Sequence, residues 1–166
     1  MKLSYLLLGC LVILAFSAVM PAQAFTAKTL TVTLNGNGDA RADMQYDLTF
    51  AEQAAIFFHV ANPSTELQKV LSDNLNEPVT VVRADSSSAE VIIPAFASVR
   101  QSGSAPTITT PAFSFAHAEQ VMDQYWYASL ISPHLSPQVT TITFPDGYQA
   151  VYYDQISIPS VSHQVA

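Results

Sequence analysis

Alternating apolar and polar residues predict a β-hairpin near the start of the chain. Residues 28–34 place Leu30, Val32 and Leu34 on one side of a strand and threonines on the other. The stretch NGNGD, residues 35–39, predicts a glycine-rich turn into a second alternating run over residues 40–50. We expect the even-numbered side chains of that run to be buried and the odd-numbered ones exposed, because neighbouring strand residues point to opposite faces.

A second hairpin is predicted near the end of the chain, over residues 139–153. Its turn is Pro-Asp-Gly at residues 145–147, in which the glycine supplies the left-handed residue. The outward face, with Val139, Val151 and Tyr153, is more apolar than a solvated face needs. The opposite, buried face is expected to carry Ile142, Phe144, Tyr148, Ala150 and Tyr152.

Three helices are predicted between the hairpins, over residues 50–61, 62–75 and 115–130. Residues 78–84 and 89–99 read as two more strands, and the Ser, Gly and Pro residues at 101–111 predict a loop. The fold class that follows is α+β: a single domain with a mainly antiparallel sheet of five to seven strands and about three α-helices packed on it.

The first 24 residues are typical of a signal peptide. Lys2 precedes an apolar stretch that runs to Met20, and Ala22 and Ala24 form a small-x-small cleavage site. This assignment leaves residues 25–166 as one exported domain, which is a common domain size. The alternative is an uncleaved membrane anchor, but the apolar stretch is shorter than the ~20 residues that span a bilayer.

We predict that the exported protein begins at Phe25. Cys10 lies inside the apolar stretch rather than at its end, so it is not expected to be a lipid-attachment site and leaves with the peptide. Intact-mass analysis of the exported protein checks this. A mass that includes Met1, or a diacylglyceryl adduct on Cys10, would contradict the prediction.

Composition narrows the classes of partner. The formal net charge is −7, and loss of Lys2 with the leader makes it −8. Such a charge disfavours nucleic acid and anionic lipid, so contact with a membrane is expected only through an uncleaved N-terminus. Without Cys10 the mature chain has no disulfide, thiolate ligand or cysteine nucleophile.

The best metal signal is weak. Asn35, Asn37 and Asp39 have the alternating spacing of calcium-loop ligands. However, Ala40 stands where an EF-hand needs glycine, and Tyr46 stands where it needs a bidentate glutamate. A glycine-rich hairpin turn is therefore the favoured interpretation, and neither a metal nor a cofactor is expected.

The sequence contains no recognisable catalytic motif. None of its four histidines belongs to an H-x-x-H or HExxH pair, and there is no G-x-S-x-G. The leading hypothesis is an exported non-catalytic module that binds a protein or glycan partner, or that serves as a component of the cell envelope. One alternative is a secreted metal-dependent or carboxylate hydrolase. Another is the same kind of extracytoplasmic domain held by an uncleaved N-terminal anchor.

Aromatic residues supply the candidate binding site. Trp126 and Tyr127 lie at the rim and on the polar side of the third predicted helix, and Tyr153 lies on the outward face of the last hairpin. If helix and hairpin are neighbours, these three side chains form a rim suited to contact with a partner or a sugar.

Overall fold

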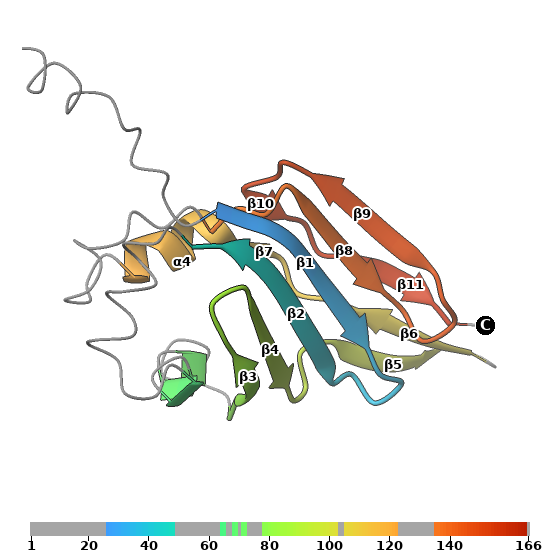
Figure 1. Ribbon diagram of the computed structural model, residues 1–166. Coiled ribbons are helices and arrows are strands. Elements are labelled where there is room, and N and C mark those ends of the chain that lie inside the picture. The colour runs from blue at the N-terminus through green and yellow to red at the C-terminus, as the bar shows by residue number, and fades with distance from the viewer. Residues whose placement is uncertain are drawn as a thin grey trace, which may run out of the picture.

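The computed structural model describes residues 26–48, 64–65, 68–69, 71–72, 78–102, 105–122 and 135–165. Its main element is a six-stranded sheet with the order β3-β4-β2-β1-β8-β9 (Figure 1). Its strands are β1 (Thr26–Leu34), β2 (Ala40–Asp47), β3 (Thr80–Ala84), β4 (Ser88–Ile93), β8 (Val139–Thr143) and β9 (Gln149–Tyr153). All neighbours are antiparallel except β1 and β8, which are parallel and lie between β2 and the edge strand β9.

Shorter strands form the rest of the described fold. A three-stranded sheet has the order β11-β6-β5, and β10 pairs with β7. The strands are β5 (Ser98–Ser102), β6 (Ala105–Thr109), β7 (Phe113–Ser114), β10 (Ser157–Ile158) and β11 (Ser162–Gln164). One eight-residue helix, α4 (Phe115–Met122), continues directly from β7.

The core lies between the six-stranded sheet and these shorter strands. Ile142 of β8, in the six-stranded sheet, and Ile108 of β6, in the three-stranded sheet, are both 0% exposed and belong to one cluster. Burial of such a side chain contributes about 1.5–3 kcal/mol. The full cluster consists of Leu30, Val32, Leu34, Ala40, Ala97, Ile108, Phe115, Ile142, Phe144 and Ile158.

The predicted α+β class, with about three helices packed on the sheet, is wrong. The described residues are mostly β-sheet, and the side chains that complete the core beside the six-stranded sheet include Ile108 of β6 and Ile158 of β10, with a single residue, Phe115, from helix α4. The loop predicted over residues 101–111 contains the end of β5 and all of β6, which pair at Gln101↔Pro106. Pro106 is tolerated because it lies beyond the last residue pair of β6 with β11, Thr107↔Gln164, and its carbonyl accepts the Val165 N–H at 2.9 Å.

The predicted helices are only partly described. Residues 50–61 lie wholly outside the described residues; of the helix predicted over 62–75, residues 64–65, 68–69 and 71–72 are described and are helical. The third helix begins at Phe115 as predicted, and its residues 123–130 lie outside the described part. The signal-peptide positions Ala22, Ala24 and Phe25 also lie outside it. Within the described part of the chain, no helix combines the length and the apolar character needed to cross a bilayer.

The first hairpin has the predicted register and faces. Leu34 pairs with Ala40 across the NGNGD turn. Along β2 the even-numbered residues from Ala40 to Tyr46 are buried or half-buried, whereas Arg41, Gln45 and Asp47 are exposed. The alternation predicted for residues 40–48 is confirmed, although Asp43 on the outer face is half-buried.

The second hairpin is also confirmed in its turn and faces. Gly147 has a φ of 87°, and its N–H donates to the Phe144 carbonyl at 2.9 Å. Phe144 is 1% exposed, and Ala150 and Tyr152 pack against the core. Tyr148, at the end of the predicted buried face, is 47% exposed.

Candidate functional site

The NGNGD turn packs against the segment between β4 and β5, and the side chains of Asn37 and Asp39 form hydrogen bonds within the protein. The Asp39 carboxylate accepts the Ala95 N–H at 2.9 Å and an Asn37 side-chain N–H at 2.7 Å. These two bonds hold the pKa of Asp39 below its ordinary value. The side-chain Oδ1 of Asn37 in turn accepts the Asp39 backbone N–H at 3.1 Å. Two of the three candidate metal ligands are therefore used to hold the turn against the segment between β4 and β5.

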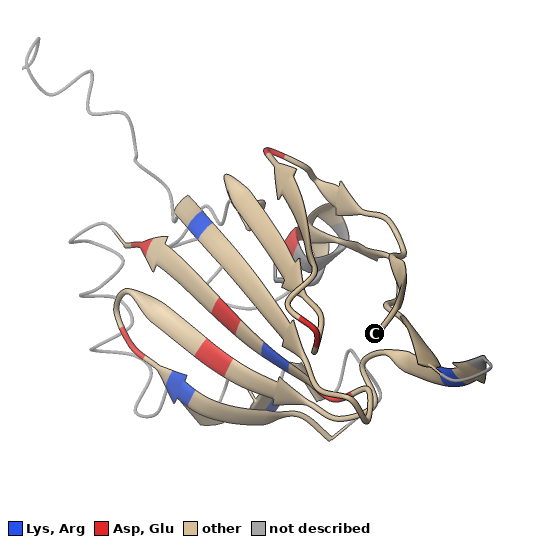
Figure 2. Cartoon of the chain, turned by 90° about the vertical axis from the view of Figure 1, so that its right-hand side faces the viewer, with Lys and Arg blue, Asp and Glu red and all other residues tan. Residues whose placement is uncertain are grey.

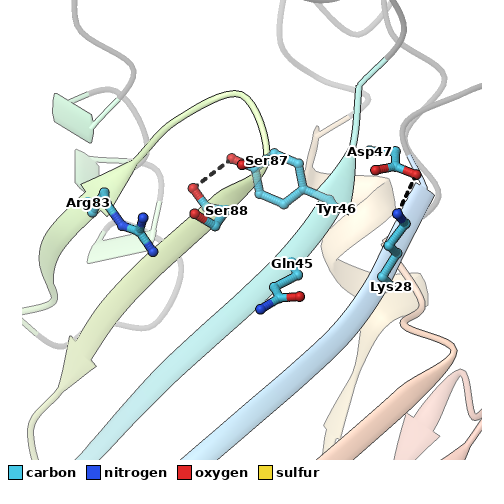
Figure 3. Close-up of a pocket in the computed structure, with 7 residues that line it drawn as sticks. All are labelled: Lys28, Gln45, Tyr46, Asp47, Arg83, Ser87 and Ser88. Carbon is cyan, nitrogen blue, oxygen red and sulfur yellow. Dashed lines mark hydrogen bonds and ion pairs between the residues drawn. The ribbon is translucent and has the colours of Figure 1, made fainter.

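A shallow polar hollow lies on the outer face of the sheet, where β1, β2 and the β3–β4 turn meet (Figure 3). Both of its cationic side chains are paired with carboxylates: Lys28 with Asp47 at 2.7 Å and Arg83 with Asp85 at 3.2 Å. Tyr46 reaches across to the turn and donates to the Asp85 carbonyl at 2.6 Å, and burial raises the pKa of its hydroxyl to about 12. Because these groups already have partners, the hollow is poorly suited to acid–base catalysis or to anion binding.

Asp85 stabilises the β3–β4 turn and should make it sensitive to acid. Its carboxylate accepts the Ser87 N–H, the main cause of a pKa lowered from 3.8 to about 2, and also the Ser88 N–H. A depressed pKa gives stability that is present above about pH 4 and lost as the pH falls towards 2. Asp85→Asn should therefore cost less than about 1 kcal/mol at neutral pH, because solvent screens this exposed carboxylate.

Urea unfolding of both proteins between pH 7 and pH 2 measures this effect. The difference in the free energy of unfolding should shrink as the pH falls from 4 to 2. A difference that stays constant over that interval would show that the Asp85 carboxylate does not stabilise the turn as a charged group.

A histidine–aspartate pair joins the two layers at the β8–β9 turn. His163 Nε2 of β11 lies 2.7 Å from Asp146 Oδ2 of the turn, and the two side chains are 22% and 18% exposed. The His163 ring stacks on Tyr148 at 4.1 Å between centroids, and its edge meets Phe144 at 5.1 Å. These contacts fix the start of β9 against β11.

The outer face of the six-stranded sheet has a charged part of four strands and an uncharged part of two. In Figure 2 the charged positions on this face lie on β1, β2, β3 and β4, whereas β8 and β9 carry none. At the end of the uncharged part Val139 pairs with Tyr153. Val151 and Tyr153 are 41% and 66% exposed, so an apolar patch borders the last strand of the sheet.

β9 presents an open hydrogen-bonding edge. The Phe144 N–H donates to the Tyr148 carbonyl and the Asp154 N–H donates to the Gln138 carbonyl, which fixes the alternation of the β8–β9 ladder. The backbone N–H and C=O groups of the even-numbered β9 residues therefore point towards β8, and those of Gln149, Val151 and Tyr153 point away from it. The Tyr153 carbonyl accepts the Gln155 side chain at 3.2 Å. In the ranges that the structure describes, nothing hydrogen-bonds to the outward N–H and C=O of Val151.

The opposite edge strand, β3, is protected in ways that β9 is not. A bulge interrupts its pairing between Val81 and Arg83, and Arg83 places a charge on the strand. The Val81 N–H is also met by the Gln68 side chain at 3.3 Å. Bulges and charges are common devices that prevent edge pairing. β9, with the sequence QAVYY, has no charge, proline or bulge.

We define the β9 edge site as Gln149, Val151 and Tyr153. Of the three aromatic residues predicted to form a binding rim, Tyr153 lies in this site, whereas Trp126 and Tyr127 lie outside the described residues. Sequence reasoning identified the apolar outward face of this hairpin but missed that β9 ends the sheet. The lack of charge in residues 149–153 is the sequence feature that could have indicated an unprotected edge strand.

If Tyr153 belongs to a surface site, its removal should be nearly neutral for stability. The side chain is 66% exposed, so Tyr153→Ser should change the melting temperature by no more than about 2 °C. Thermal unfolding followed by circular dichroism measures it. A loss of several degrees would assign Tyr153 to packing rather than to binding.

Comparison with family models, curated proteins and solved structures found no match to this chain.

Proposed function

We propose that this chain is an exported, non-catalytic protein-binding module that takes an extended segment of a partner along β9. The observation that carries the proposal is the β9 edge site, where the outward N–H and C=O of Val151 have no partner among the described residues and lie beside an apolar patch. The signal-peptide pattern of residues 1–24 supports export.

In binding by strand addition, the backbone edge and the apolar patch would have different roles. The outward N–H and C=O groups of Val151 would pair with the partner backbone, which supplies affinity without regard to sequence. Alternate partner side chains would lie beside Val151 and Tyr153, and they would supply the specificity. Because β9 is uncharged, the best partner segment is uncharged, with β-branched or aromatic residues on one face.

The fixed position of β9 favours binding. Tyr148 at its start stacks on His163, which in turn contacts Asp146 of the turn. A strand that is already ordered loses little conformational entropy when a partner pairs with it.

The hydrolase alternative draws no support from the same histidine–aspartate pair. Among the described residues, His163 contacts the Asp146 carboxylate and the rings of Phe144 and Tyr148, so none of these contacts joins the imidazole to a hydroxyl that it could activate. A glycan partner would use Tyr153 as a stacking surface but would leave the free backbone edge unused.

Peptide selection tests the proposal even though the partner is unidentified. A displayed library of twelve-residue peptides is selected on the exported protein, and the binders are measured against Val151→Pro. This variant removes the outward N–H of residue 151 and leaves the bonds between β8 and β9 intact. Selected peptides should alternate apolar residues and lose at least tenfold in affinity for the variant.

Val82→Ala, which trims an exposed apolar side chain of the other edge strand, is the control and should bind the peptides like the unmodified protein. Peptides that bind Val151→Pro with unchanged affinity would contradict the proposal. A glycan array that instead shows sugar binding abolished by Tyr153→Ser would replace it with the glycan alternative.

A further inference from the structure

We infer that the segment that pairs with β9 is β9 of a second copy of this chain, so that two six-stranded sheets join edge to edge. The inference rests on the proposed function, since it names the occupant of the same β9 edge site. A symmetric pair of this kind is isologous: the same surface of both copies forms the contact.

The sequence of β9 is self-complementary in one antiparallel register. When Val151 lies opposite Val151 of the second copy, its outward groups exchange both hydrogen bonds with their equivalents. In the same register Gln149 lies opposite Tyr153 of the second copy, whose outward N–H can donate to the Gln149 carbonyl, whereas the Tyr153 carbonyl already accepts the Gln155 side chain. On the inner face, Ala150 lies opposite Tyr152 of the second copy, so a small side chain meets a large one.

No charge repulsion between the two β9 strands opposes this register. β9 carries no ionisable carboxylate or cation, although the chain as a whole has a formal charge of −7. The flanking Asp154 lies opposite Tyr148 of the second copy rather than opposite another Asp154. Like charges directly opposite each other would be destabilising, and this register avoids them at that position.

Because β3 is poorly suited to edge pairing and β9 is well suited to it, two copies should form a closed dimer rather than an open chain of molecules. β3 is interrupted by a bulge and carries Arg83, so it is a poor partner for β9. Pairing β9 with β9 uses the open edge of each copy and closes the assembly at two. Because five-residue strands form a small contact, the dimer is expected to be weak and to depend on concentration.

Sedimentation velocity of the exported protein over a hundredfold range of concentration tests the inference. The unmodified protein should pass from monomer to dimer within that range. Val151→Lys places a cation on the twofold axis against its own equivalent, and it should weaken dimerisation at least tenfold. Val82→Lys, the same change at an exposed position of β3, should leave dimerisation unchanged.

A disulfide gives a second, register-specific test. In a Cys10→Ser background, Val151→Cys should form a dimer linked by a disulfide when oxidised glutathione supplies the oxidant and is reduced to glutathione. Opposed residues of a hydrogen-bonded antiparallel pair lie ~5.5 Å apart between Cα atoms, which is within the range a disulfide spans. Val82→Cys under the same conditions should remain mostly unlinked.

The outcomes separate this inference from the proposed function. A monomer at all concentrations that still binds the selected peptides overturns the inference and retains the strand-binding function. A monomer that binds no peptide through β9 overturns both. A dimer unaffected by Val151→Lys also overturns the inference, because its contact then lies elsewhere.

Discussion

Gly38→Ala should destabilise the protein by about 3 kcal/mol or more, which corresponds to a fall of roughly 10 °C in melting temperature. Gly38 has a φ of 91°, a conformation that side chains with a Cβ rarely adopt. A Cβ there would also lie 2.3 Å from the Ala97 carbonyl oxygen, a backbone atom that has little room to move. The Ala97 N–H donates to the Gly38 carbonyl at 2.8 Å, so the clash would break the docking of the NGNGD turn as well.

Two other glycines separate the contributions of strain and contact. Gly36 has no atom within 4 Å of the added Cβ and its φ lies outside the left-handed region, so Gly36→Ala should be nearly neutral. Gly147 has a φ of 87° but open space around it, so Gly147→Ala should cost only the strain, about 1 kcal/mol. Thermal unfolding should therefore show the largest loss for Gly38→Ala, a smaller one for Gly147→Ala and the smallest for Gly36→Ala. A Gly38→Ala protein as stable as Gly36→Ala would show that the turn does not dock on Ala97.

Phe144→Ala should cost about 3–5 kcal/mol, the range for large side chains removed from a packed core. Phe144 is 1% exposed, and its ring lies 5.7 Å from that of Tyr148 and 5.1 Å from that of His163. Its removal leaves a cavity between β8 and β11 and loosens the contact that holds the start of β9. The loss should therefore lower both stability and binding at the β9 edge site.

Val151→Ala is the control for this change, because it removes apolar atoms from a side chain that is 41% exposed. Its effect on the free energy of unfolding should stay within about 0.5 kcal/mol. Urea unfolding of both variants measures the two values. A Phe144→Ala protein that loses less than about 1 kcal/mol would mean that Phe144 does not pack in the core as described.

The hairpins could be predicted from sequence because their signals are local. The alternation in residues 40–48 fixes which side chains of β2 are buried, and Pro-Asp-Gly fixes the turn between β8 and β9. The parallel pairing of β1 with β8 joins residues far apart in the chain, for example Thr31 with Thr141. Side-chain periodicity carries no information about which strand lies beside another, so the sheet order could not be derived.

The second layer was missed because its strands are short and rich in turn-forming residues. In β6 the sequence APTIT contains one large apolar residue, Ile108, yet this side chain is 0% exposed and completes the core. Tyr153 could be predicted to face outward, since it follows the pattern of the hairpin. Its place beside an open edge depends on the sheet order and therefore needed the structure.

Amide hydrogen exchange along β9, followed by nuclear magnetic resonance, tests the central claim most directly. In dilute protein the inward N–H groups of Ala150 and Tyr152 should be protected, whereas the outward N–H groups of Gln149, Val151 and Tyr153 should exchange rapidly. Addition of a selected peptide, or a hundredfold rise in protein concentration, should protect the outward groups and leave the inward ones unchanged. Outward amides that are already protected in the dilute protein, or that stay unprotected when the ligand is bound, would contradict the claim that β9 binds a partner strand.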